Sequence, residues 1–309
     1  MANVFIKEAL LPNGEKLAYR EREGGQNTII LVHGNMTSSI HWEPVIRDLS
    51  PEYKVYAVDL RGFGQSTYHK KVTSIKDFSD DLKMFVDGLS IKNFALVGWS
   101  LGGAVCQQFC SDYQGFCNML FLLTSASSRG YPHHATRKNG KPDLSKRISS
   151  YTDILDDIKT RMIQAAYDKS DFAFLKQLWD TLIYNQQQPD AKTYLKHLED
   201  MTAQRNLAEC YHALNTFNIS SFHNGLVAGE DKLKHINIPV LIAWGENDLV
   251  VTKEMTNELI EDFGDQAESI KLTGCGHAPM VDSPHQLIAI MESFLSNKQV
   301  SSLMTNVND

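Results

Sequence analysis

The segment 94–103, Phe-Ala-Leu-Val-Gly-Trp-Ser-Leu-Gly-Gly, places the strongest constraint on how this chain can fold. Its apolar first half is short and bounded, which is typical of a buried strand, and the residues from Leu101 to about Tyr113 are compatible with a helix. A serine at a sharp strand-to-helix turn, here Ser100, exposes its hydroxyl, and the flanking glycines avoid collisions around it. The helix start also directs free N–H groups and a positive dipole end towards the serine, which suits a developing anion. Since Gly-x-Ser-x-Gly also occurs by chance, a nucleophilic role for Ser100 depends on suitably placed partners.

Strand-like and helix-like segments alternate on both sides of this motif. The alternation predicts an α/β fold, with a mostly parallel central sheet and helices on both of its faces. An opening hairpin is expected first, because the turn signal Pro12-Asn13-Gly14 separates two short strand candidates. The other expected strands are 28–32, 53–58, 119–124, 240–244 and 269–272, and the clearest expected helices are 75–89, 252–263 and 284–295.

Residues 125–235 interrupt the alternation. No strong strand is evident there: 129–143 is rich in Gly, Pro, His and Lys and is expected to be a loop, and four amphipathic helical stretches follow it. We therefore expect an α/β core formed by residues 1–124 and 236–295, a helical insertion at 125–235, and a flexible C-terminal tail at 296–309.

A serine hydroxyl acts as a nucleophile at neutral pH only with a base and a carboxylate that orients the base. Of the eleven histidines, His277 is the strongest candidate, because it follows an expected strand in a glycine-flanked loop. Asp248 lies four residues beyond another expected strand, and loops of this kind meet at the carboxyl edge of an open α/β sheet. We predict Ser100, Asp248 and His277 as the catalytic residues. Glu246 is the alternative acid, and a helix N-cap is the alternative role for Asp248.

An acyl-transfer site also needs donors for the oxyanion. The backbone N–H groups of Leu101, directly after Ser100, and of Asn35, in the loop after the third strand, are the predicted donors. Met36 and Trp99 are adjacent to these groups in the sequence, and we predict that they line the substrate pocket.

Several other polar residues have simpler interpretations. His33 is expected to be a structural hydrogen-bonding residue that shapes the loop containing Asn35, and Asp59 and Arg61 are expected to pair around a glycine-rich loop. His133-His134 lacks a matched third ligand, so no metal site is expected there.

The composition narrows the choice of partner and compartment. A net charge of −7 over 309 residues argues against a nucleic-acid or anionic-membrane partner. The five cysteines include no Cys-x-x-Cys pair, which favours a reducing compartment. No signal peptide is recognised, and no apolar run approaches the roughly 20 residues that span a bilayer. A cytoplasmic protein without membrane insertion is the expectation.

The chain resembles the α/β-hydrolases over nearly everything outside residues 125–235. The matching motifs are His33-Gly34-Asn35, the Asp-Leu-Arg-Gly-Phe-Gly-Gln-Ser segment 59–66, Gly98-Trp99-Ser100-Leu101-Gly102-Gly103, Gly245-Glu246-Asn247-Asp248 and Gly276-His277. The resemblance implies a Ser100–Asp248–His277 triad, a helical cap formed by 125–235, and hydrolysis of an ester-like bond without cofactor or metal. Relatives that open epoxides or remove halogens use an aspartate in place of Ser100, so those activities are not expected. The Gly-Trp-Ser-Leu-Gly-Gly form resembles the methyl ester esterases of biotin synthesis and many general carboxylesterases. The methyl ester esterases usually have a shorter cap, so the resemblance does not imply that this chain acts on their substrate.

The sequence thus predicts a carboxylesterase-like serine hydrolase acting on a small to medium, largely apolar ester through an acyl-enzyme. An aromatic-rich cap predicts a covered, largely apolar pocket. The same triad also serves lactones, thioesters, carbon–carbon bonds next to a carbonyl, and acyl transfer to an alcohol; a non-catalytic ligand receptor is a further alternative. No cap motif identifies the substrate, and the oligomeric state stays open between monomer and homodimer.

Overall fold

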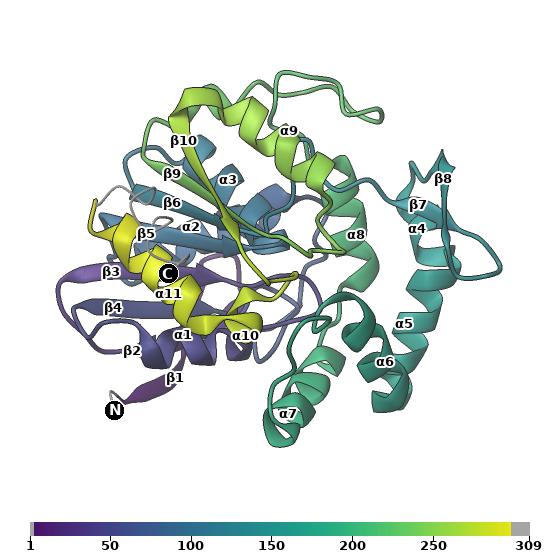
Figure 1. The fold of residues 1–309 in the computed structure, drawn as a ribbon, viewed down its shortest axis with the longest axis horizontal. Helices are drawn as coiled ribbons and strands as arrows, with labels where there is room; N and C mark the ends of the chain where they lie inside the picture. Colours follow the sequence, from purple (N-terminus) through teal and green to yellow (C-terminus); the bar gives the residue numbers. More distant parts are fainter. Residues whose placement is uncertain (1–2, 298–309) are drawn as a thin grey trace.

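An eight-stranded sheet organises the computed structural model, which describes residues 3–297 (Figure 1). The strand order is β1-β2-β4-β3-β5-β6-β9-β10. β2 pairs antiparallel with β1 and with β4, and all other neighbours are parallel. The strands are β1 (Val4–Leu10), β2 (Lys16–Arg22), β3 (Asn27–Val32), β4 (Tyr53–Val58), β5 (Phe94–Trp99), β6 (Cys117–Leu123), β9 (Val240–Gly245) and β10 (Ala267–Leu272). The mostly parallel sheet and the opening hairpin are therefore confirmed.

Both faces of the sheet are covered, and strand β3 shows how. Ile29 and Leu31 belong to one buried apolar cluster, whereas Ile30 and Val32 belong to the other. Successive side chains of a strand point to opposite faces, so a continuous Ile-Ile-Leu-Val run is what a doubly covered parallel strand requires.

Different helices supply the two clusters. Apolar residues of α2, α3 and α9 pack in the cluster that contains Ile30 and Val32, and those of α1 and α11 pack in the cluster that contains Ile29 and Leu31. The core helices are α1 (Glu43–Asp48), α2 (Ile75–Gly88), α3 (Leu101–Asp112), α9 (Lys253–Phe263), α10 (Pro279–Asp282) and α11 (Pro284–Leu295), with short 3-10 turns η1 (Ser39–Trp42), η2 (Leu233–His235) and η3 (Gly264–Gln266). Within residues 3–297, no helix combines the length and apolar character that crossing a bilayer requires.

The chain between β6 and β9 forms a separate group of elements beside the sheet (Figure 1). It begins with a two-stranded hairpin, β7 and β8, so the expectation of a loop over 129–143 and of no strand in the insertion was wrong. Asn139-Gly140 supplies the reason: this dipeptide favours a tight hairpin turn, and Gly140 has φ +80°. The elements are β7 (His134–Thr136), β8 (Pro142–Arg147), α4 (Tyr151–Asp156), α5 (Ile158–Lys169), α6 (Phe172–Leu182), α7 (Ala191–Thr202) and α8 (Leu207–Thr216).

Helix α8 connects this group to the core. Its Cys210, Ala213 and Leu214 belong to the same buried cluster as α2 and α3. Most of the tail expected at 296–309 lies outside the described residues.

Candidate active site

Ser100 occupies the turn between β5 and α3 in a conformation that few residues adopt. Its φ is 56° and its ψ is −117°, and positive φ is costly for a residue with a side chain. Ser100 is the N-cap residue of α3, yet its hydroxyl makes no capping hydrogen bond. The turn is fixed instead by the backbone: the Ser100 N–H donates to Leu123 O at 3.1 Å, and Ser100 O accepts from the Gly103 N–H at 2.9 Å. In the described part of the chain, backbone bonds thus hold the turn and no capping bond occupies the Ser100 hydroxyl.

The two glycines around Ser100 are required by close backbone contacts. A Cβ on Gly98 would overlap the Gly102 carbonyl, and a Cβ on Gly102 would overlap the carbonyl oxygen of Val32. Because these neighbours are backbone atoms, they cannot move aside as a flexible side chain would. The glycines let α3 start directly against β3 and β5.

Asp248 and His277 are hydrogen-bonded, as the predicted triad requires. The His277 Nδ1–H donates to Asp248 Oδ2 at 2.9 Å, and both side chains are at least 95% buried. Asp248 Oδ1 accepts the N–H groups of Val250 and Val251 at 2.8 and 3.0 Å. These bonds fix the carboxylate, which in turn fixes the imidazole tautomer that leaves Nε2 free as a base.

Glu246, the alternative acid, is held elsewhere. Its carboxylate accepts from Lys271 Nζ at 2.8 Å and from the Gly274 N–H at 3.1 Å. The structure therefore places Asp248, and not Glu246, at the His277 ring.

The backbone of His277 is tied to the strands that end beneath it. Its carbonyl oxygen accepts from Trp99 Nε1 at 2.7 Å and from Thr124 Oγ1 at 3.0 Å. Since Trp99 directly precedes Ser100, these bonds hold the histidine loop beside the serine turn. Trp99 is 1% exposed and supports His277 from within the core.

The loop after β3 lies against Ser100. A Cβ on Gly34 would be 3.1 Å from Ser100 Cβ. The ring of His33 shapes this loop as expected: Nδ1–H donates to Gly34 O at 2.7 Å, and Nε2 accepts from the Leu60 N–H at 2.9 Å. Burial lowers the pKa of His33 to about 4, so the ring is neutral at pH 7 and can accept at Nε2.

The two predicted oxyanion donors sit in this region. Leu101 is the first residue of α3, so its N–H has no partner within the helix. Asn35 is oriented by its side chain, because Asn35 Oδ1 accepts from Gln204 Nε2 at 2.8 Å. No pattern in the sequence identified Gln204, which lies 169 residues away in the segment after α7.

The expected pairing of Asp59 with Arg61 is wrong. Arg61 donates from Nε and Nη2 to the two carboxylate oxygens of Asp81 on α2, at 2.6 and 2.5 Å. Asp59 accepts the backbone N–H groups of Ser39 and Gln65, each at 2.9 Å. Asp59 and Arg61 therefore have different partners. Asp59 stabilises two turns through their backbone N–H groups, whereas Arg61 is the counter-ion that the buried Asp81 carboxylate needs.

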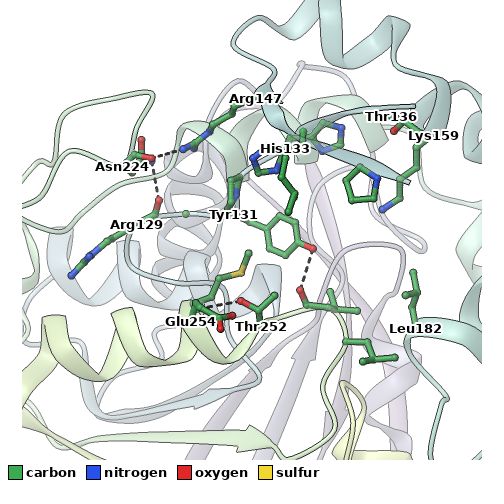
Figure 2. Close-up of a pocket in the computed structure, with 18 of the residues that line it drawn as sticks. Arg129, Tyr131, His133, Thr136, Arg147, Lys159, Leu182, Asn224, Thr252 and Glu254 are labelled. Atoms are coloured by element: carbon green, nitrogen blue, oxygen red, sulfur yellow. Dashed lines mark hydrogen bonds between the residues drawn. The ribbon is translucent and has the colours of Figure 1, made fainter. Parts of the chain in front are cut away.

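A cavity of about 1040 Å³ opens next to the Asp248 loop, between the insertion and α9 (Figure 2). Leu249 and Val250, the residues after Asp248, line it, and the Tyr131 hydroxyl at its wall donates to Val250 O at 3.1 Å. Met36 and Trp99, the predicted pocket residues, are not among those that line this cavity. Of the aromatic residues of the insertion, Tyr131 and Phe174 line it, whereas Trp179 and Tyr184 are buried in the apolar core.

Comparison with known proteins finds matches that cover most of this chain. The family model for the alpha/beta hydrolase fold matches residues 27–284. A pimeloyl-[acyl-carrier protein] methyl ester esterase of Aliivibrio salmonicida is 25% identical over 282 residues, which cover 90% of this chain and 95% of that protein. The AB hydrolase superfamily protein YisY of Bacillus subtilis is 21% identical over 88% of this chain and 92% of its own length.

Two solved structures show the same fold. The esterase EaEST of Exiguobacterium antarcticum superposes with a TM-score of 0.71 at 16% identity, over 95% of this chain and 100% of that one. A putative lipase of Acinetobacter baumannii superposes with a TM-score of 0.71 at 22% identity, over 97% of this chain and 92% of that one. Since the family model spans most of the sequence and the sheet, the serine turn and the Asp–His pair agree with it, this chain belongs to the alpha/beta-hydrolase family.

Proposed function

We propose that this chain is a serine hydrolase that cleaves a carboxylic ester of a small to medium, largely apolar substrate through an acyl-enzyme. The observation that carries the proposal is the combination of an uncapped, positive-φ Ser100 with an Asp248–His277 hydrogen bond of 2.9 Å. A free hydroxyl on a rigid turn and a buried, oriented imidazole are the parts that nucleophilic acyl transfer needs.

In the proposed reaction, Ser100 Oγ attacks the ester carbonyl while His277 Nε2 takes its proton. Asp248 holds Nδ1–H and stabilises the imidazolium that forms. The N–H groups of Asn35 and Leu101 bind the oxyanion, and each such donor typically contributes about 3 kcal/mol of transition-state stabilisation. His277 then gives its proton to the leaving alkoxide, and water activated by the same imidazole releases the acid from the acyl-enzyme.

Two further observations favour an ester. Much of the cavity wall beside Asp248 is apolar, which suits an acyl or alkyl chain. The Aliivibrio salmonicida relative is named as a methyl ester esterase, and it aligns along nearly its whole length.

Hydrolysis of p-nitrophenyl esters from acetate to laurate tests the proposal, with Ser100→Ala as the matched variant. We expect turnover by the wild-type protein, a loss of at least 10³-fold in Ser100→Ala, and labelling of Ser100 by a fluorophosphonate. Labelling without ester turnover would redirect the search to thioesters, lactones and diketones. Absence of both labelling and turnover would contradict a hydrolase and favour a ligand receptor.

A further inference from the structure

The backbone N–H of Asn35, a predicted oxyanion donor, belongs to a peptide unit that neighbouring residues of the same loop fix at one end. A trans peptide is planar, so the Asn35 N–H points opposite to the Gly34 carbonyl. Gly34 O accepts from His33 Nδ1–H at 2.7 Å and from Thr37 Oγ1–H at 2.8 Å. These bonds hold the Gly34 end of the peptide unit, and the Asn35 end needs a separate contact.

The residue after Asn35 shows why that contact matters. Met36 has a φ of 61°, in the left-handed region that is costly for a residue with a side chain. A strained turn of this kind persists only where the surrounding structure holds it. The hydrogen bond from Gln204 Nε2 to Asn35 Oδ1, 2.8 Å long, holds the chain at the start of this turn.

A backbone carbonyl of the core sets the direction of the bond between Gln204 and Asn35. A carbonyl oxygen can only accept, so the Arg61 carbonyl requires Asn206 to present Nδ2, which donates to it at 2.7 Å. Asn206 Oδ1 then faces Gln204 and accepts from Nε2 at 3.1 Å. The second hydrogen of Nε2 goes to Asn35 Oδ1, and Gln204 Oε1 accepts from the Tyr167 hydroxyl at 3.2 Å. These partners specify one orientation of the Gln204 amide.

The side chains of Tyr167, Gln204 and Asn206 form a buried relay that belongs to the insertion. Their exposed fractions are 5%, 3% and 0%. Tyr167 lies on α5, whereas Gln204 and Asn206 lie between α7 and α8. The low dielectric of a buried site strengthens such bonds and makes the loss of a partner costly. The insertion therefore contacts a donor of the core through a fixed amide.

We propose that Gln204 is a positioning residue for ester hydrolysis: it holds the Asn35 side chain and thereby keeps the Asn35 N–H directed at the oxyanion. The inference rests on the proposed reaction at Ser100, and it gives the insertion a part in the catalytic step in addition to covering the substrate. The oxyanion is absent from the bound ester. A misdirected N–H therefore lowers kcat and leaves KM nearly unchanged.

Gln204→Met tests the proposal, because methionine keeps the length of the side chain and removes its hydrogen bonds. We expect kcat for p-nitrophenyl butyrate to fall about 10- to 30-fold, less than the loss of a whole oxyanion donor, with KM within about twofold of wild type. Gln164→Met is the matched control, since Gln164 on α5 donates to Asp168 Oδ1 at 2.9 Å in an exposed bond. The control should leave both constants unchanged, and thermal melting verifies that both variants fold.

Asn35→Ala tests the same contact from its other end. It removes the side chain that Gln204 holds, keeps the backbone N–H, and affects a residue that is only half-buried. We expect the same loss of kcat as in Gln204→Met. In the double variant the second substitution should cost no more than about twofold further, because both substitutions remove one contact. Should Gln204→Met fail to fold, an unchanged kcat in Asn35→Ala would overturn the proposal.

Two other results would also overturn it. Losses that multiply in the double variant would show that Gln204 acts through general packing, and a raised KM with an unchanged kcat would show that it acts in substrate binding.

Fluorophosphonate labelling of Ser100 separates this inference from the proposed ester hydrolysis, because labelling needs the nucleophile and the oxyanion site but no ester. Slower labelling in Gln204→Met than in wild type, with no such difference in the Asn35→Ala background, supports the positioning role even if p-nitrophenyl esters are not turned over. Equal labelling rates in Gln204→Met and wild type would refute the role while the nucleophile is established. A wild-type protein that neither labels nor hydrolyses would refute the proposed reaction and the positioning role with it.

Discussion

The two carboxylates in the loop after β9 show how single residues acquire their roles. Asp248 uses Oδ1 for two backbone N–H groups and Oδ2 for His277, whereas Glu246 is exposed and paired with Lys271. Both lie within the length of a short loop, so sequence spacing alone left them as alternatives. The hydrogen bonds in the structure distinguish the two residues, because only a fixed and buried carboxylate, here that of Asp248, can hold one imidazole tautomer.

Asp248→Asn should lower kcat for a p-nitrophenyl ester by about 10³- to 10⁴-fold, since an amide cannot stabilise the same tautomer and imidazolium. The matched control is Glu246→Gln, which we expect to stay within about twofold of wild type. Rates are measured at saturating substrate, and thermal melting verifies that both variants fold. A severe loss of activity in Glu246→Gln together with a mild loss in Asp248→Asn would show that Glu246, and not Asp248, is the catalytic acid.

At the scale of elements, the end of α7 contacts the loop and turn that follow β3. Asp200 Oδ1 accepts from Ser38 Oγ at 2.6 Å. Asp200 Oδ2 is buried, has no hydrogen-bond partner among residues 3–297, and lies 3.8 Å from His41 Nδ1. The His41 ring stacks on His197 of α7, with ring centroids 4.0 Å apart. This buried polar contact joins the insertion to the loop that contains Asn35.

Asp200 should make stability depend on pH. Burial raises its pKa to about 7, above the ordinary 3.8, so the unfolded chain loses this proton first as pH rises. The contribution of Asp200 to stability is therefore complete below pH 3.8. It falls by about 1.4 kcal/mol per pH unit between these two values, and stays constant above them.

Asp200→Asn cannot ionise and keeps an acceptor for Ser38, so its stability relative to wild type should increase between pH 4.5 and pH 8. Guanidinium unfolding at the two pH values measures this difference. Glu199→Gln, an exposed change on the same helix, is the control and should show no such trend. A stability difference that is the same at both pH values would refute the contribution of Asp200.

At the scale of the whole molecule, the core was predictable and the insertion only partly so. The strands and the positions of Ser100, Asp248 and His277 follow from local apolar runs and from the rule that parallel strands gather their loops at one edge. The β7–β8 hairpin was missed because its strands are polar, so only Asn139-Gly140 indicated it. The contact between Gln204 and Asn35 could not be predicted, since it depends on how the insertion packs on the core and no local pattern records that.

The distribution of exposed apolar side chains across the molecule leads to the last prediction. Met162 from the insertion is 50% exposed and Leu249 from the core is 59% exposed, and both line the same cavity. Exposed apolar groups from two parts of the chain that meet at one cavity indicate a surface for an apolar ligand.

Met162→Ala and Leu249→Ala should each lower kcat/KM for the laurate ester by about three- to tenfold, as expected for the loss of one or two buried methylene contacts. Turnover of the acetate ester should not change, because a two-carbon acyl group has no chain for an apolar surface to bind. Leu155→Ala is the control, since Leu155 is 45% exposed and lies outside the cavity lining. Equal losses for acetate and laurate would mean that these residues support the catalytic centre and do not select the chain.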